Sequence, residues 1–303
     1  MRFGLDGAAR MLFSGNTALL TTAVIWGFSF VAQRTGMEFV GPFTFNGVRF
    51  ALGALSLLPL IFLFRDKQEQ TKKTDNIAVA KAGSILGIIL IFAASLQQIG
   101  LVYTTAGKAA FITCLYIILV PMAALLLKQA VPKQTIVGGI IAVIGLYLLC
   151  VKETAALSYG DFLELIGAFF WTAHIIMIGK YSGKMNGIQL AFYQFTVCSV
   201  ISLIIAALTE EIILASILAA WIPIAYGGIL TVGLAYTLQI IGQQRVEPSL
   251  AAILLSMETV FAAIGGYWLL DEILSTTEFI GMLLMFAGML TAQMRINMKR
   301  KVQ

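Results

Sequence analysis

Residues 93–100 read AASLQQIG, and residues 235–242, which follow 142 positions later, read AYTLQIIG. Five of the eight positions are identical, and a glutamine, Gln97 or Gln239, stands at the same place in each copy. Chance is the alternative, because Ala, Leu, Ile and Gly are common in a chain that is 59% hydrophobic. A shared glutamine in apolar surroundings argues for duplication. A repeat near half the chain length predicts two related halves.

The same offset extends beyond these two stretches. It places Tyr116 opposite Glu258 and Ala109-Ala110 opposite Ala251-Ala252. We therefore divide the chain into residues 1–152 and 153–303, and we expect the function to lie between the two halves.

The composition indicates an integral membrane protein. The mean hydropathy is +0.92, 12% of the 303 residues are charged, and the apolar residues extend along the whole length. A soluble domain could not bury so much apolar surface. The net charge of +5 does not indicate a nucleic-acid partner, because the basic residues lie in short connections without interleaved aromatic residues. Three cysteines in apolar runs are expected to be buried thiols: Cys114, Cys150 and Cys198.

A bilayer core of about 30 Å needs roughly 20 apolar residues per helix. With that length the sequence predicts ten spans, five in each half. They are residues 17–35, 42–64, 79–101, 106–127, 134–151, 159–181, 188–208, 217–242, 249–270 and 277–294.

The positions of Lys and Arg predict the orientation, because cytoplasmic loops carry most of these residues. With the N-terminus in the cytoplasm, three cations, Arg34, Lys108 and Lys152, face the other side, and Arg49 lies within a span. The remaining sixteen face the cytoplasm: Arg2, Arg10, Arg65, Lys67, Lys72, Lys73, Lys81, Lys128, Lys133, Lys180, Lys184, Arg245, Arg295, Lys299, Arg300 and Lys301. Both termini should therefore be cytoplasmic. Because five is odd, the two repeats are inverted, which is typical of transporters with a site at the repeat interface.

Glycines on one helix face predict close helix packing. Gly83 and Gly87 form one such pair. Gly138 and Gly145 in the fifth span match Gly281 and Gly288 in the tenth. We assign the fifth and tenth spans to scaffolding or to a homodimer contact, since they contain few polar residues.

Ionisable residues within spans are costly and need a reason. Arg49 could receive a carboxylate or phosphate, or form a structural pair. Glu258 lies near the centre of its span, where removal from water disfavours the charged form, so proton coupling is its functional interpretation; a neutral acid bonded across helices is the alternative. His174 could bind substrate or be a packed core imidazole.

The inverted repeat brings polar and aromatic residues to one place. Tyr116 and Glu258 should occupy equivalent positions near the midplane, with Gln97 toward the outside and Gln239 toward the inside. A weaker alignment, at an offset of 145, matches Trp26 with Trp171. The predicted substrate cavity is lined by Trp26, Asn46, Arg49, Gln97, Tyr116, His174, Tyr193, Gln194, Tyr236, Gln239 and Glu258.

Signals of an enzyme are weak. The sequence has no HExxH, no paired His/Cys spacing, no P-loop and no Gly-x-Ser-x-Gly. We expect no catalytic residue, no metal and no cofactor.

Several motifs together resemble the EamA-type family of the drug/metabolite transporter superfamily. They are WGFSF from Trp26, PFTFNGVRF from Pro42, Pro121, and Asp271-Glu272 followed by Gly281 and Gly288. The resemblance covers essentially the whole chain. It implies an inner-membrane carrier of small organic solutes, often an exporter of amino acids or other metabolites, with a central cavity between the halves. Glu272 resembles a loop glutamate of the family but is matched by Ala130 in the first half, so we assign it a structural role.

We therefore expect an all-α polytopic membrane protein with ten transmembrane helices as two inverted five-helix repeats. Its expected function is secondary-active transport, with net export, of small organic metabolites such as amino acids by alternating access. The expected partners are the small-molecule substrate and the bilayer. The alternatives are a flippase for lipids or isoprenoids, which would have a lateral opening to lipid, and a membrane-embedded lipid-modifying enzyme.

Overall fold

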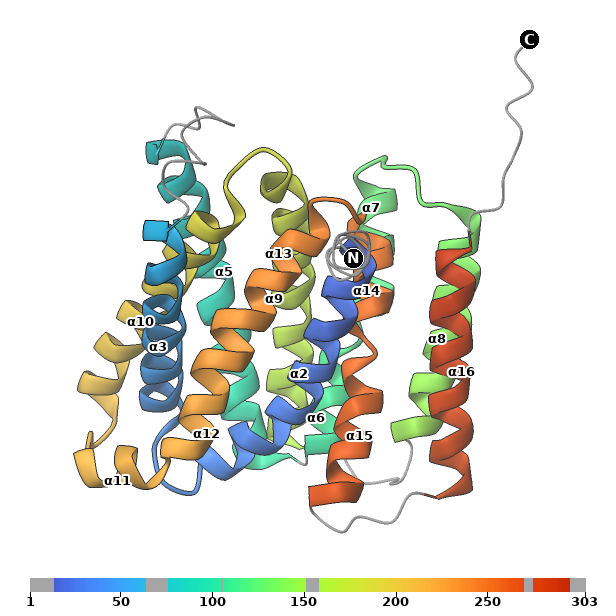
Figure 1. The fold of residues 1–303 in the computed structure, drawn as a ribbon. Helices are drawn as coiled ribbons and strands as arrows, with labels where there is room; N and C mark the ends of the chain where they lie inside the picture. The colour runs from blue at the N-terminus through green and yellow to red at the C-terminus, as the bar shows by residue number, and fades with distance from the viewer. Residues whose placement is uncertain (1–13, 64–75, 105, 151–157, 270–274, 295–303) are drawn as a thin grey trace, which may run out of the picture.

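A computed structural model describes residues 14–63, 76–104, 106–150, 158–269 and 275–294, and the regular elements in these ranges are all helical (Figure 1). The helices before residue 151 are α2 (Gly15–Gly36), α3 (Pro42–Leu63), α5 (Asn76–Tyr103), α6 (Ala106–Thr113), α7 (Tyr116–Leu126) and α8 (Lys133–Cys150). Those after residue 157 are α9 (Tyr159–Ser182), α10 (Gly187–Thr209), α11 (Leu214–Ala219), α12 (Trp221–Ala225), η1 (Tyr226–Tyr236), α13 (Thr237–Gln243), α14 (Pro248–Leu255), α15 (Glu258–Leu269) and α16 (Thr276–Gln293). The predicted boundary at residues 152 and 153 lies outside the described residues.

Eight helical stretches in the described ranges are long and apolar enough to cross a membrane. They are Gly15–Gly36, Pro42–Phe62, Asn76–Tyr103, Lys108–Leu126, Tyr159–Ser182, Gly187–Thr209, Trp221–Gln243 and Pro248–Gly265. The predicted spans 134–151 and 277–294 correspond to α8 and α16, which are not among these eight. The all-helical class is confirmed, and the count of ten spans stays a prediction.

The two halves interleave instead of folding side by side. Helix α3 packs along α10, α5 packs along α9 and α10, and α2 packs along α15 and η1. The pair Gly83 and Gly87 faces α10: a Cβ atom at Gly83 would lie 2.5 Å from Tyr193 Cβ, and one at Gly87 would lie 2.7 Å from Val197 Cβ. The predicted close packing at these glycines is confirmed, and the helix that they contact belongs to the other half.

Two predicted spans are each broken by a short turn. Span 106–127 divides into α6 and α7 after Thr113, and span 249–270 divides into α14 and α15 after Leu255. The backbone bonds at the two breaks match at the 142-residue offset: the amide of Ile117 donates to Cys114 O (2.9 Å) and that of Thr259 donates to Ser256 O (3.2 Å). The prediction of one continuous helix was wrong in both cases, because neither turn contains the Gly or Pro that usually signals a break.

The broken helices cross in an inverted arrangement. Helix α6 contacts α15, and α7 contacts α14, so the first part of each broken helix lies against the last part of the other. This arrangement brings the two breaks together and fits the predicted inverted topology.

Helices α8 and α16 form a close pair at one side of the bundle (Figure 1). A Cβ atom at Gly145 would lie 2.6 Å from Gly281 O, and Gly138 and Gly288 face each other in the same way. The absent side chains let the backbones approach, as expected where lipid supplies no hydrophobic drive. The glycine faces that the sequence singled out are therefore occupied within one chain.

The π-helix η1 interrupts a span that should match α5. Helix α5 is a regular α-helix throughout, whereas the chain from Tyr226 to Tyr236 has π-helical bonding. The three glycines of η1, at positions 227, 228 and 233, lie against α3, and a Cβ atom at Gly228 would lie 2.8 Å from Leu52 Cβ. π-Helical segments are frequent at functional sites.

Candidate functional site

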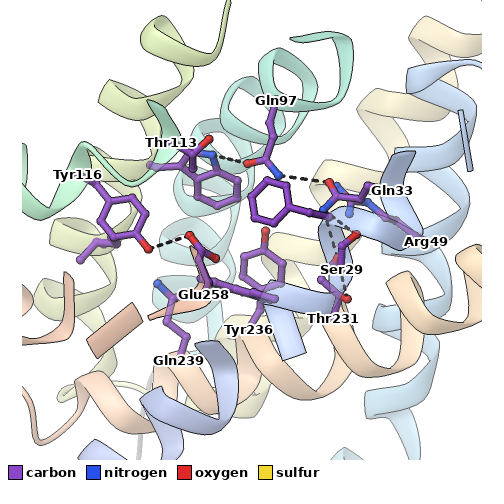
Figure 2. Close-up of a pocket in the computed structure, with 14 residues that line it drawn as sticks. Ser29, Gln33, Arg49, Gln97, Thr113, Tyr116, Thr231, Tyr236, Gln239 and Glu258 are labelled. Carbon is purple, nitrogen blue, oxygen red and sulfur yellow. Dashed lines mark hydrogen bonds between the residues drawn. The ribbon is translucent and has the colours of Figure 1, made fainter. Parts of the chain in front are cut away.

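The two helix breaks meet at a contact between Tyr116 and Glu258. The Tyr116 hydroxyl donates to Glu258 Oε1 at 2.8 Å (Figure 2). Cys114 Sγ lies 3.3 Å from the same oxygen. Tyr116 is the first residue of α7 and Glu258 the first of α15. The two positions that the sequence repeat makes equivalent are therefore in contact.

This contact borders a central cavity lined by both halves. Its volume, measured as the space that the centre of a water molecule can reach, is about 30 Å³. One water needs about 10–15 Å³ on this measure, so the cavity has room for only a few waters. In this conformation the cavity is thus narrower than the pockets of drug-sized ligands. The lining residues are Trp26, Ser29, Phe30, Gln33, Arg49, Gln97, Thr113, Tyr116, Trp171, Ile175, Thr231, Tyr236, Gln239 and Glu258.

Three aromatic rings form one wall of the cavity. The centroid of the Tyr236 ring lies 4.7 Å from that of Trp26 and 6.1 Å from that of Trp171, and the two Trp rings are 6.3 Å apart. The weaker alignment of Trp26 with Trp171 therefore identifies two residues that pack together. Such a wall favours a planar or apolar part of a ligand.

A chain of hydrogen bonds forms a second wall. Trp171 Nε1 donates to Gln97 Oε1 (3.0 Å), and Gln97 Nε2 donates to Gln33 Oε1 (3.3 Å). Gln33 Nε2 then donates to Ser29 Oγ (3.1 Å), which also accepts from Thr231 Oγ1 (3.0 Å). The network joins α9, α5, α2 and η1, and so it connects the two halves (Figure 2).

Arg49 supplies a buried positive charge to the cavity. Its side chain is 2% exposed, its Nε donates to Asn46 Oδ1 (3.0 Å), and its guanidinium carbon lies 5.1 Å from the centroid of the Phe50 ring. No described carboxylate forms an ion pair with it. The cation is thus held by an amide and aromatic faces, and its outer nitrogens form no hydrogen bond with a described residue.

Gln239 has no hydrogen-bond partner among the described residues. Its side chain is fully buried, and both Nε2 and Oε1 are unpaired. Trp26 Nε1 is likewise buried and unpaired within the described part of the chain. Figure 2 shows Gln97 and Gln239 on opposite sides of the Glu258 carboxylate. Buried polar groups are nearly always bonded, so these atoms need an explanation.

The eleven predicted site residues divide into three groups. Seven line the cavity: Trp26, Arg49, Gln97, Tyr116, Tyr236, Gln239 and Glu258. Three lie behind it: Asn46 holds Arg49, and His174 Nε2 lies 3.0 Å from Gln194 Oε1. Tyr193 lies away from the cavity, where it packs against Phe192 and Gly83.

Sequence reasoning missed several residues. Gln33 and Thr231 line the cavity, but Gln33 lies near the predicted end of its span, and the direction of Thr231 depends on η1. Glu164 is fully buried and accepts from Thr113 Oγ1 (2.9 Å), a residue of the cavity wall. Glu164 lies within the predicted span 159–181 but is not among the ionisable residues to which the sequence assigns a role. Glu272, assigned a structural role, lies outside the described residues.

A family model described as the EamA-like transporter family matches residues 13–151 and again residues 158–292. The chain belongs to the EamA-like transporter family. The double match agrees with the two-repeat architecture of this family, and it confirms the resemblance to the drug/metabolite transporter superfamily.

Relatives of this EamA-like chain are transporters by description. A protein of Archaeoglobus fulgidus described as an uncharacterized transporter is 31% identical over 297 residues, which cover 97% of this chain and 89% of the relative. The uncharacterized transporter YoaV of Bacillus subtilis is 20% identical over 281 residues, which cover 89% of this chain and 93% of that protein. A solved crystal structure aligns with a TM-score of 0.73 at 15% identity over 92% of this chain and 96% of that chain, which shows the same fold. These likenesses support a membrane transporter.

Proposed function

We propose that this protein is a secondary-active carrier that exports small organic metabolites, such as amino acids, by alternating access. The observation that carries the proposal is the cavity at the two matched helix breaks, where Tyr116 from one half bonds Glu258 from the other. Discontinuous helices that meet at a repeat interface are the usual site of substrate in such carriers.

The lining residues support a modest-sized amphipathic substrate. Arg49 binds an anionic group such as a carboxylate, and the rings of Trp26, Trp171 and Tyr236 contact an apolar or planar part. Because the cavity is narrow in this conformation, the two halves move apart on one side to admit the substrate.

Glu258 is the proposed coupling residue. It is 4% exposed and lines the cavity, and its hydrogen bonds to described residues all go to Oε1. A buried carboxyl group is tolerated best in its neutral form. In the proposed cycle it takes a proton from one side and releases it to the other when access changes.

The finer architecture belongs to the same proposal. The chain has ten spans, with α8 and α16 as the fifth and tenth, and lies in the inner membrane with both termini in the cytoplasm. A homodimer through these two helices would use their outer surfaces, on which Tyr147 and Phe286 are exposed, because their glycines face each other. Catalysis forms no part of the proposal.

The test is uptake and counterflow in proteoliposomes with pooled labelled amino acids and related metabolites, with and without an imposed pH gradient. We expect saturable flux that is stimulated by substrate on the opposite side. In Glu258→Gln, exchange should persist while accumulation driven by the pH gradient is lost. The matched control is Glu247→Gln, an exposed acid at the start of α14, which should accumulate substrate normally.

Two results would count against the proposal. Accumulation by Glu258→Gln under a pH gradient would remove the coupling role, and absence of flux from folded protein for every pool would remove the carrier function.

A lipid flippase is the second candidate, and one observation favours it. An apolar cavity of about 380 Å³, on the same measure as the central one, lies between α2, α15 and α16 and is bordered by Met257, the neighbour of Glu258. Its other lining residues are Leu20, Val260, Phe261, Ile264, Met282, Leu283, Phe286 and Met289. An acyl chain could occupy this space while a head group reaches Glu258. Transbilayer movement of fluorescent phospholipids in the same liposomes, without metabolite counterflow, would favour this candidate.

A further inference from the structure

Each half contains one Trp and one Gln that are equivalent to a Trp and a Gln in the other half, and the repeat pairs the Trp of one half with the Gln of the other. Gln97 matches Gln239 at an offset of 142, and Trp26 matches Trp171 at an offset of 145. An inverted repeat that pairs Trp171 with Gln97 also pairs Trp26 with Gln239. All four residues line the central cavity.

The two pairs are in different states. Trp171 Nε1 donates to Gln97 Oε1 at 3.0 Å, and Gln97 Nε2 also has a partner in Gln33. In the other pair, Trp26 Nε1, Gln239 Nε2 and Gln239 Oε1 all lack a hydrogen-bond partner among the described residues. Trp26 is 8% exposed and Gln239 is fully buried.

Unpaired buried groups in a cavity wall indicate a bound ligand. Burying a donor or an acceptor without a partner costs free energy, and here three such atoms belong to two residues that line one cavity. A ligand that formed hydrogen bonds with these atoms would recover this cost on binding, so the site would discriminate strongly between ligands that can and cannot form them.

The unpaired atoms also indicate what the ligand carries. Trp26 Nε1 and Gln239 Nε2 are donors, and Gln239 Oε1 is an acceptor. The primary amide of Gln239 can form hydrogen bonds with a second planar group in which a carbonyl lies beside an N–H. The Tyr236 ring, 4.7 Å from Trp26, supplies a flat neighbour for that group. Arg49 lies on the other side of Tyr236 from Gln239 in Figure 2.

We propose that Trp26 and Gln239 bind an amide-type group of the substrate, such as a carboxamide or a lactam, while Arg49 binds an acidic group of the same molecule. This inference rests on the proposed function, because it assigns a substrate class to the transport cavity.

Three four-carbon acids test the assignment. Succinamate carries a carboxylate and a carboxamide, succinate replaces the amide with a second acid, and butyrate replaces it with a methyl group. Their affinities for the purified full-length protein are measured by calorimetry and by the shift in melting temperature. We expect succinamate to bind about tenfold more tightly than either analogue.

Variants then locate the effect. Gln239→Leu and the isosteric Gln239→Glu should lose the preference for succinamate. The matched control is Gln194→Leu, which removes an equally buried amide that bonds His174 and does not line the cavity. It should keep the preference.

The outcomes separate the two proposals. Equal binding of the three acids, no binding of succinamate, or an unchanged preference in both Gln239 variants would overturn the amide site. Amide-selective binding without flux would overturn the proposed carrier function and support the amide site. Flux of metabolites that lack an amide group, together with equal binding of the three acids, would support the carrier function and overturn the amide site. If Gln239→Leu does not fold, the binding of the three acids to the wild-type protein and to Gln239→Glu tests the amide site.

Discussion

Gln97 and Gln239 occupy equivalent places in the two halves, yet Gln97 is fully bonded and Gln239 is unpaired. Sequence repeats would suggest equal environments. The difference shows that contacts within the protein hold one side of the cavity, and we propose that the other side binds the ligand. In an inverted-repeat carrier the two sides exchange roles as access alternates, so a difference of this kind is expected of any single conformation.

The helices that bear the two glutamines differ in the same sense. Gln97 lies on the regular helix α5, whereas Gln239 follows the π-helix η1. Thr231 of η1 donates to Ser29, and Tyr226 at its start donates to Ile25 O (2.9 Å). The π-helical segment therefore holds α2 at two points, whereas the matching stretch of α5, residues 84–94, accepts a hydrogen bond from α3, from Asn46 Nδ2 to Ala94 O (3.2 Å).

The largest expected effect is that of Gln97→Leu. It would leave Trp171 Nε1 and Gln33 Oε1 buried without partners, and each unpaired group costs about 1–3 kcal/mol. We expect the free energy of unfolding to fall by roughly 2–4 kcal/mol, measured by titration of detergent-solubilised protein with SDS. A loss of less than about 1 kcal/mol would mean that the network contributes little to stability.

The same substitution in the other half should have the opposite sign. Gln239→Leu removes two unpaired polar atoms and adds apolar contacts, so the ligand-free protein should gain about 1–2 kcal/mol. Transport should fall at the same time, because the amide is lost. Destabilisation by Gln239→Leu as large as that by Gln97→Leu would show that Gln239 is bonded, and the two halves would then be equivalent.

The sequence predicted the parts of the site that depend on the repeat. The offset that matches Gln97 with Gln239 also matches Tyr116 with Glu258, and the structure shows that these two residues are in contact. Hydropathy located eight of the predicted spans, since the length of an apolar run is set by the bilayer. Two buried thiols, Cys114 and Cys198, are also as predicted, and the side chain of Cys150 lies outside the described residues.

Other features could not be read from the sequence because they depend on tertiary contacts. The turns at Cys114 and Ser256 have no Gly or Pro, and the bonds that hold them include Thr259 Oγ1 to Ser256 O (2.8 Å). Glu164 is buried because α9 packs on α5 and α6, which a single span cannot reveal. The change to π-helical bonding in η1 determines which of its side chains reach the cavity, so Thr231 could not be assigned from helical periodicity.

The smallest expected effect tests the difference between η1 and α5. Thr231 is matched by Ile89 at the 142-residue offset, so Thr231→Ile makes the second half like the first. The change removes the hydrogen bond to Ser29 Oγ (3.0 Å), which still accepts from Gln33, and it should cost about 0.5–1.5 kcal/mol of unfolding free energy. The control is Thr172→Val, because the Thr172 hydroxyl donates to Ala168 O (2.8 Å) within its own helix. If both variants lose the same stability but only Thr231→Ile slows transport, the link between η1 and α2 serves the motion of the two halves. Equal transport by the two variants would mean that η1 serves only helix packing. The functional difference between the two halves would then depend on Gln97 and Gln239 alone.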